Sequence, residues 1–393
     1  MNVKTVKKPA RRVDTGYVSR FKMQAYGYNN LYPQNIAQIT EASGTAMLCI
    51  DRYARFIEGY GFGNDAVAEY ILNNEGDTTD DILKNVAADL AKFGGFALHV
   101  NYNVLCQVSD VHHVPFENCR LEETDDKGCV AHILVHQDWT QSKTRNGKKL
   151  RVSEDTIERF NTFNPDPNIV SQQIDNAGGI DTYKGQIMWC SLDGKFVYPK
   201  ARYDSAITEI STDEGLGNVK ARNVRNNFLV SCMLISKRGE PKVDPETGDE
   251  IDSGQMITEE DLQQFQGDEN SLKILSIELE NDEDEPKVVA FPTKNFDKEF
   301  SVTDASVIER IYAQFHQELF YAIRIGKLGF SGQVMQDAYE YYAGEVTVEQ
   351  RFIERAFKKV FSAYTDPFMQ TVELTLQPLK YISSEVAGNN TID

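Results

Sequence analysis

The chain has 393 residues and a net charge of −19, from 60 acidic residues against 41 Lys and Arg. It contains no run of the roughly 18 apolar residues needed to span a bilayer, and its N-terminus has no apolar signal core. Length and composition therefore predict a soluble protein of two or three domains, made in a cytoplasm. The six cysteines have no short paired spacing, which is typical of reduced thiols.

The N-terminal half begins with a basic arm at residues 1–25 that we expect to be flexible, with Lys4, Lys7, Lys8, Arg11 and Arg12. Apolar spacing from residue 35 then predicts two helices, the second ending at Gly59–Gly63. Another amphipathic helix is expected at 80–93, followed by a strand at 96–102. Short apolar runs between polar turns make 104–200 β-rich.

Helical signals resume at 201–210 and 216–234, and an acidic insert follows. Between positions 240 and 299 there are 19 acidic residues against five lysines, including the run Asp282, Glu283, Asp284 and Glu285. Like charges this close repel within the Debye length of about 10 Å, so the insert should be solvated or line a surface. Composition alone leaves open a solubilising loop and a negatively charged wall that a polyanion passes without sticking.

Within and after the insert we expect a short helix at 258–265, strands at 271–279 and 287–291, and one long helix at 304–325 capped by Thr303. The long helix has a continuous apolar stripe: Val307, Ile308, Ile311, Tyr312, Phe315, Leu319, Ala322 and Ile323. A loop with three glycines follows at 326–332. Residues 347–350 have the pattern of a capping box that opens a last helix.

Candidate chemistry is sparse. The glycines of Gly59–Gly63 could cradle a phosphate, but they follow a helix and open no βαβ unit, so we favour a helix cap and tight turn. Cys106, His112, His113 and Cys119 lack metal-ligand spacing, because adjacent histidines on a strand point to opposite faces. We therefore expect neither enzyme activity nor a cofactor.

Taken in order, several segments resemble the portal proteins of tailed bacteriophages and prophages. Each is weakly specific, and their order and spacing across residues 25–365 carry the resemblance. They are Asn30–Pro33 with the helices ending at Phe56–Gly61, then Phe93–Leu98, Val114–Arg120, Tyr198–Pro199, Arg225–Phe228, Leu328–Gln333 and the helix at 347.

The resemblance implies an α+β portal fold in a ring-forming oligomer, typically of twelve subunits. It divides the chain after the arm into a wing (26–215), stem helix 1 (216–235), an acidic clip (236–300), stem helix 2 (301–325), a tunnel loop (326–335), and wing return helices with a C-terminal tail (336–393). The chain departs from the pattern at its C-terminus, where little sequence remains after Tyr364. We therefore expect a small or absent crown.

The resemblance further implies a DNA channel at one capsid vertex of the virion, assembled in the bacterial host cytoplasm, for packaging and ejecting double-stranded DNA. Its expected partners are further copies of the chain, the terminase large subunit, a head–tail connector and the major capsid protein, with no membrane. An acidic clip fits this role, because each neutralised phosphate would add affinity and slow translocation.

Four sets of residues are the candidate sites. The tunnel loop would present Lys327, Leu328, Phe330 and Ser331 to the channel, and Ile308, Ile311, Phe315 and Leu319 would pack stem helices of adjacent subunits. Lys220, Arg222 and Arg225 would form inter-subunit ion pairs, which we favour, or rings meeting phosphates. The acidic clip contributes Asp282, Glu283, Asp284 and Glu285. The alternatives are a soluble α/β enzyme using Gly59–Gly63 and a non-portal virion structural protein.

Overall fold

The computed structural model describes residues 16–381, except 127, 142–143, 146–147, 150, 195–196 and the parts of 226–295 outside the strands given below. The chain is a mixture of helices and strands in two compact units. We call residues 1–207 with 311–393 the α/β body, and residues 208–310 the helix-pair unit. In the part of the chain that the structure describes, no helix has the length and apolar character to cross a membrane.

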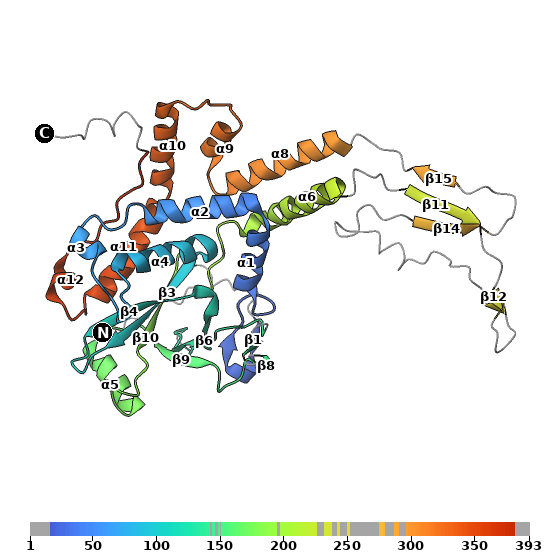
Figure 1. Cartoon of the computed structure of the whole chain (residues 1–393). Coiled ribbons are helices and arrows are strands. Elements are labelled where there is room, and N and C mark those ends of the chain that lie inside the picture. The colour runs from blue at the N-terminus through green and yellow to red at the C-terminus, as the bar shows by residue number, and fades with distance from the viewer. Residues whose placement is uncertain are drawn as a thin grey trace. The chain divides into compact units, whose positions relative to one another are not determined.

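The body contains a six-stranded mixed sheet in the order β4-β3-β10-β9-β6-β5 (Figure 1). Its strands are β3 (Gly95–Tyr102), β4 (Val108–Val114), β5 (Cys119–Leu121), β6 (His132–Val135), β9 (Glu158–Thr162) and β10 (Gln186–Ser191). The predicted strand at 96–102 and the β-rich region after it are confirmed. The parallel pair β9–β10 needs a crossover, and helix α5 (Pro167–Ala177), which we did not expect, lies in it.

The body also contains the helices predicted around residues 35–58, 80–93 and 347–361 (Figure 1). Those helices are α1 (Tyr32–Ala42), α2 (Gly44–Glu58), α4 (Thr79–Phe93) and α11 (Thr347–Phe361). The body further contains α3 (Asp65–Ala68), α9 (Glu318–Arg324), α10 (Gly332–Glu345) and α12 (Pro367–Thr371). Two small ladders, β1 (Tyr17–Val18) with β2 (Met23–Gln24) and β7 (Thr144–Arg145) with β8 (Lys148–Lys149), complete the body.

The capping box expected at the start of α11 is wrong. Val346 is the N-cap, and the Thr347 hydroxyl donates backwards to the carbonyls of Ala343 and Gly344. Glu349 and Gln350 face the core, where Gln350 donates to the carbonyl of Phe56 at 3.1 Å. The side chains that the local pattern assigned to a cap therefore make tertiary contacts or bond to the preceding turn.

The two faces of the sheet have separate cores. On one face Phe96 meets Phe352 of α11, with ring centroids 5.7 Å apart. On the other face Ala97 and Ile187 belong to a buried cluster with Tyr26 and Tyr198, whose rings stack at 4.1 Å. The alternation along β3 and β10 places these residues on opposite faces, as a sheet buried on both sides requires.

The helix-pair unit contains α6 (Ile207–Arg225) from residue 208, α8 (Phe296–Gln314) up to residue 310, and the strands between them. Strands β14 (Leu275–Leu279), β11 (Cys232–Lys237) and β15 (Lys287–Ala290) form one sheet, and β12 (Lys242–Val243) pairs with β13 (Glu250–Ile251). The strands predicted at 271–279 and 287–291 are therefore confirmed. The short helix expected at 258–265 lies outside the described residues.

Three helix boundaries differ from expectation. Helix α6 is continuous through Gly215 and Gly217 and ends at Arg225, so the span 216–235 is not one helix. Residues 232–237 are the central strand of a sheet, which suits their β-branched and apolar side chains. Helix α8 begins at Phe296, which puts Thr303 inside the helix and not at its cap.

Candidate functional site

Helices α6 and α8 run antiparallel and are joined by two ion pairs. Lys220 Nζ lies 2.8 Å from Asp304 Oδ2, and Arg310 Nη1 lies 3.5 Å from Glu209 Oε1. The two pairs fix the direction, because the residue nearer the end of α6 contacts the residue nearer the start of α8. All four side chains are at least partly solvent-exposed, so each pair contributes at most about 1 kcal/mol.

This geometry bears on the three basic residues expected in stem helix 1. Lys220 has a partner in its own chain, Asp304, while its expected contact with a neighbouring subunit or with phosphate stays a prediction. Arg222 and Arg225 lie on the last turn of α6, and the placement of their side chains is outside the described residues. The acidic run Asp282, Glu283, Asp284 and Glu285 lies outside them as well.

The part of the predicted apolar stripe that follows residue 310 belongs to the body. Ile311 and Phe315 are both 0% exposed, and Phe315 packs against the rings of Tyr53 and Tyr203, at centroid distances of 6.4 and 5.2 Å. These two side chains are therefore core residues of their own chain. The prediction that they pack adjacent stem helices is corrected, because no part of either side chain reaches the surface.

The other two residues of that set remain accessible. Ile308 and Leu319 are half-buried, so both retain surface that a second molecule could cover. They lie on different helices, because the single helix predicted at 304–325 is broken. Helix α8 ends at Gln314, His316 has a positive φ of 55°, and α9 begins at Glu318.

The break changes the direction of the chain, so that side chains of α9 contact Tyr312 near the end of α8. Arg324 Nη1 donates to the Tyr312 hydroxyl at 2.9 Å, and the rings of Tyr312 and Tyr321 are 5.3 Å apart. In one straight helix residues 312 and 324 would be separated by about 18 Å along the axis. The chain therefore reverses between Phe315 and Glu318 and places the following loop at the end of an α9–α10 hairpin.

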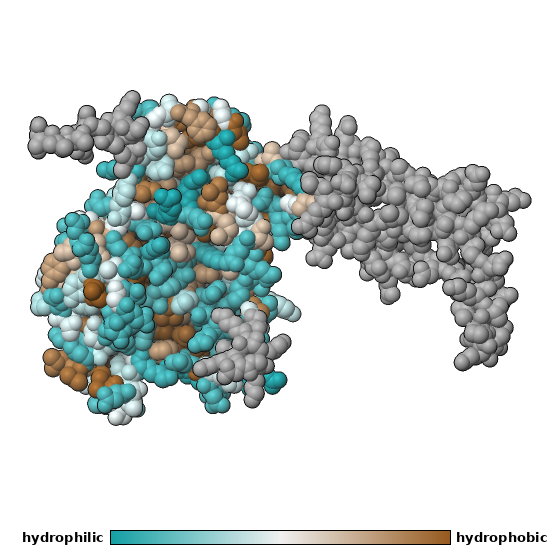
Figure 2. All heavy atoms as spheres, in the orientation of Figure 1, coloured by the Kyte–Doolittle hydropathy of each residue, from teal (hydrophilic) through white to brown (hydrophobic). Residues whose placement is uncertain are grey.

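The loop at the end of this hairpin exposes apolar side chains. Ile325 is 44%, Leu328 46% and Phe330 75% exposed, and Figure 2 shows hydrophobic surface at the α9–α10 turn. Lys327 is exposed in the same loop. We call residues 325–331 the apolar loop. Its expected exposure of Leu328 and Phe330 is confirmed, while its direction in an assembly stays a prediction.

The ends of the apolar loop are ordered by hydrogen bonds. The amide of Lys327 donates to the carbonyl of Ala322 at 2.9 Å, and Gly326 takes a positive φ of 77° that suits glycine. At the other end the Ser331 hydroxyl accepts from the amide of Val334 and caps α10. The loop is therefore shorter than the range 326–335, since α10 starts at Gly332.

The Gly59–Gly63 segment is a helix end, as favoured. Gly59 is the C-cap of α2 with a φ of 65°, and the following amides are all used within the chain. Those of Tyr60 and Gly63 donate to the carbonyls of Gln377 and Thr375, and that of Phe62 donates to the Asp80 carboxylate. A segment whose amides are occupied and which faces a carboxylate cannot cradle a phosphate.

A buried polar network, which the sequence did not suggest, joins Arg202 to helices of the body. Tyr53 donates to Glu349 Oε1 at 2.5 Å, and Arg202 Nη1 lies 3.2 Å from the Tyr53 hydroxyl and 3.4 Å from Glu349. Burial and the adjacent Glu349 raise the pKa of Tyr53, so its hydroxyl stays a donor. Glu345 lies 3.8 Å from Arg202 and 3.0 Å from His316. These contacts organise the core.

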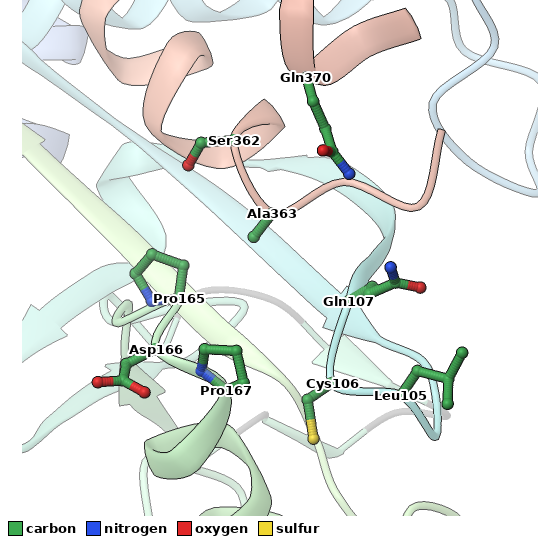
Figure 3. Close-up of a pocket in the computed structure, with 9 residues that line it drawn as sticks. All are labelled: Leu105, Cys106, Gln107, Pro165, Asp166, Pro167, Ser362, Ala363 and Gln370. Carbon is green, nitrogen blue, oxygen red and sulfur yellow. The ribbon is translucent and has the colours of Figure 1, made fainter. Parts of the chain in front are cut away.

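A cavity of about 610 Å³ lies between the β3–β4 turn, the start of α5 and the α11–α12 connection (Figure 3). Pro165, Pro167 and Leu105 form much of its lining, with Cys106 at one side. Asp166 also lines it, but its carboxylate already accepts from the amide of Asn168 as the cap of α5. Pockets with catalytic chemistry bring several polar groups together, and this lining offers no such group of titratable side chains.

The histidines and cysteines considered for metal binding do not converge. His113 contacts the Asp89 carboxylate at 2.7 Å and Cys119 is buried, while His112 lies on the other face of β4 beside His99. Within the described ranges, no group of three His, Cys, Asp or Glu side chains is arranged to hold a metal ion.

No protein-family model matches the chain, and no curated protein matches it. Among solved structures, it is similar to a chain in the neck of a native gene transfer agent particle computed with C12 symmetry, with 12% identity, a TM-score of 0.46, and coverage of 94% of this chain and 86% of that one. A chain in the virion of the native gene transfer agent particle has 12% identity and a TM-score of 0.44, with coverage of 88% of this chain and 83% of that one. An HK97 family phage portal protein from Corynebacterium diphtheriae has 9% identity and a TM-score of 0.32, with coverage of 73% of this chain and 83% of that one.

Proposed function

We propose that the chain is the subunit of a portal ring, which forms a channel at one capsid vertex for the packaging and ejection of double-stranded DNA. The observation that carries the proposal is the order of elements that the sequence resemblance requires. Two antiparallel helices, α6 and α8, enclose a β-containing acidic segment in the chain, and an exposed apolar loop follows after the short helix α9.

In this proposal the ring contains twelve copies and has no enzyme activity of its own. The segment 236–300 is the clip, where the ATP-driven terminase large subunit docks during packaging and the head–tail connector binds afterwards. Its excess of acidic residues repels phosphate, which keeps the DNA mobile in the channel. The body contacts the major capsid protein, and the apolar loop narrows the channel around DNA.

The enzyme alternative relied on Gly59–Gly63 as a ligand-binding loop, and the amides of this segment are hydrogen-bonded within the chain. The alternative of a non-portal virion structural protein differs from the portal in its assembly, since it forms no ring with a channel.

Deletion of the clip tests the function. Replacing residues 236–300 with a short Gly/Ser bridge should leave the six-stranded sheet folded, by circular dichroism and thermal melting, and abolish nuclease-protected DNA in a packaging reaction. The reason is that the sheet and its two cores lie in the other compact unit. Normal packaging by the deletion variant would overturn the clip assignment.

A second test separates the loop from general surface hydrophobicity. The double substitution of Leu328 and Phe330 by Ser should leave the assembled mass unchanged and reduce packaging or retention of DNA. Val348 is 66% exposed on α11 and serves as the matched control, because Val348→Ser removes an exposed apolar side chain outside the loop. Equal effects of the loop and control variants would contradict a channel role.

A further inference from the structure

The break between α8 and α9 conflicts with the local sequence. No Gly or Pro occurs between Asp304 and Ile325, and the apolar stripe keeps helical spacing through the break. The conformation nevertheless requires His316 to take a positive φ, which costs a non-glycine residue on the order of 1–2 kcal/mol. Some tertiary contact must stabilise the reversal against these local preferences.

The side chain of Gln317 supplies that contact. It is fully buried, and its Nε2 donates to the carbonyl of Cys49 at 2.9 Å and lies 2.8 Å from the Tyr342 hydroxyl. Its Oε1 accepts from Arg52 Nη1 at 3.0 Å. One side chain thus connects the break to α2 and to α10, and all its amide contacts are made to buried or partly buried groups.

The same contacts hold the backbone on each side of the break. The Tyr342 hydroxyl donates to the carbonyl of Phe315 at 3.0 Å, and the amide of Gln317 donates to the carbonyl of Tyr312. Arg52 also lies over the ring of Phe320, 4.4 Å from its centroid. Residues before and after the reversal are therefore tied to one polar cluster centred on Gln317.

We propose that Gln317 is the positioning residue of the apolar loop 325–331, because its buried amide holds the α8–α9 reversal that places this loop at the surface. The residue does not lie in the loop and would not touch a ligand there. The loop depends on the reversal through short connections, since α9 has only seven residues and its last turn forms the hydrogen bonds of Gly326 and Lys327. The structural part of this inference is independent of the proposed function.

The test measures hydrogen exchange of the loop in the full-length chain. Gln317→Met keeps the side-chain volume and removes the polar contacts, so exchange of the amides of residues 325–331 should increase about tenfold, while the amides of β3 and β10 keep their protection. Unchanged exchange in the loop would overturn the proposal. So would an equal increase throughout the body, because that would indicate a general loss of core stability.

A rescue experiment distinguishes positioning from packing. His316→Gly and His316→Ala both remove the contact with Glu345, but only Gly takes a positive φ without strain. In the Gln317→Met background, Gly at 316 should return loop exchange to within about threefold of the wild type, and Ala should not. Equal rescue by both, or by neither, would contradict the assignment.

If Gln317→Met does not fold, the single variants at 316 still test the reversal. His316→Val should raise loop exchange relative to His316→Gly, because a β-branched residue disfavours the left-handed conformation. A Val variant with the loop exchange of the Gly variant would overturn the proposal. Packaging assays on the same variants test the proposed function separately. Increased loop exchange with normal packaging would support Gln317 as the positioning residue and contradict a channel role of the loop.

Discussion

The α/β body and the α6–α8 helix pair differ in what holds them together. The body has two apolar cores, and even its buried Arg120 has all five donors paired, with Asn30, Gln34 and the carbonyls of Glu117 and Cys119. The helix pair relies on two partly exposed ion pairs and few buried apolar side chains in its described residues. The comparison predicts that the body is stable in one chain and that the two ion pairs of the helix pair add little to that stability.

The largest effect is expected at Phe315, in the core of the body. Phe315→Ala should reduce the free energy of unfolding by about 3–5 kcal/mol, since the ring is fully buried between Tyr53 and Tyr203. The loss should not depend on protein concentration in denaturant unfolding, because the cavity lies within one chain. Ile308→Ala, on the half-buried side of α8, is the control and should cost less. A Phe315 variant of normal stability that only dissociates would restore the inter-subunit interpretation.

Arg120 tests how far the body depends on its buried polar groups. Burial lowers the pKa of its guanidinium to about 10, and its partners are neutral oxygens. Arg120→Met should cost about 3 kcal/mol or more, because it leaves buried acceptors without a donor. Arg151→Met, at an exposed position, should change stability by less than about 0.5 kcal/mol. Equal melting temperatures for the two variants would show that Arg120 is dispensable.

A smaller effect is expected from pH. Burial lowers the pKa values of His99 and His136, so folding favours their neutral forms. Their contribution is complete above the unfolded pKa of about 6.5 and is lost as the pH falls below it. The melting temperature should therefore decline between pH 6.5 and 5, and less steeply in His99→Gln.

The difference in the pH dependence of the melting temperature between the wild type and His99→Gln gives the contribution of His99. Glu58 and Asp80 have raised pKa values through desolvation and act in the opposite direction, but they are present in both proteins. Parallel pH profiles for the two proteins would assign the acid sensitivity to other groups.

The smallest effect is expected in the helix pair. Lys220→Ala should cost less than about 1 kcal/mol in the isolated chain, because Lys220 and Asp304 are 51% and 30% exposed. A double-mutant cycle with Asp304→Ala at low and high salt gives the coupling energy, and the exposed Lys184–Glu158 pair of the body is the reference. A coupling well above that of the reference pair would show that the helix pair is more than a set of surface ion pairs.

The sequence predicted the parts of the fold that local periodicity decides. Helices α2 and α4, the strand at β3 and the glycine end of α2 are where the pattern placed them. The break at His316 could not be predicted, because its cause is Gln317 contacting Cys49 and Tyr342, which are distant in the chain. Core positions such as Phe315 looked like interface positions, since periodicity shows that a face is apolar but not what covers it.

In the candidate site, too, local features could be predicted from the sequence and long-range contacts could not. The exposure of Leu328 and Phe330 was predictable because a glycine-rich loop leaves few ways to bury them. The partner of Lys220 was not, since it depends on the register between α6 and α8, and no sequence signal specifies the distance between those helices.

Electron microscopy of the purified full-length chain tests the central claim most directly. A portal subunit should form rings with an axial channel, and twelve copies of a 44.5 kDa chain give a particle of roughly half a megadalton. We predict class averages with twelvefold symmetry and a central opening. Monomers or dimers without a channel across the accessible concentration range would contradict the account.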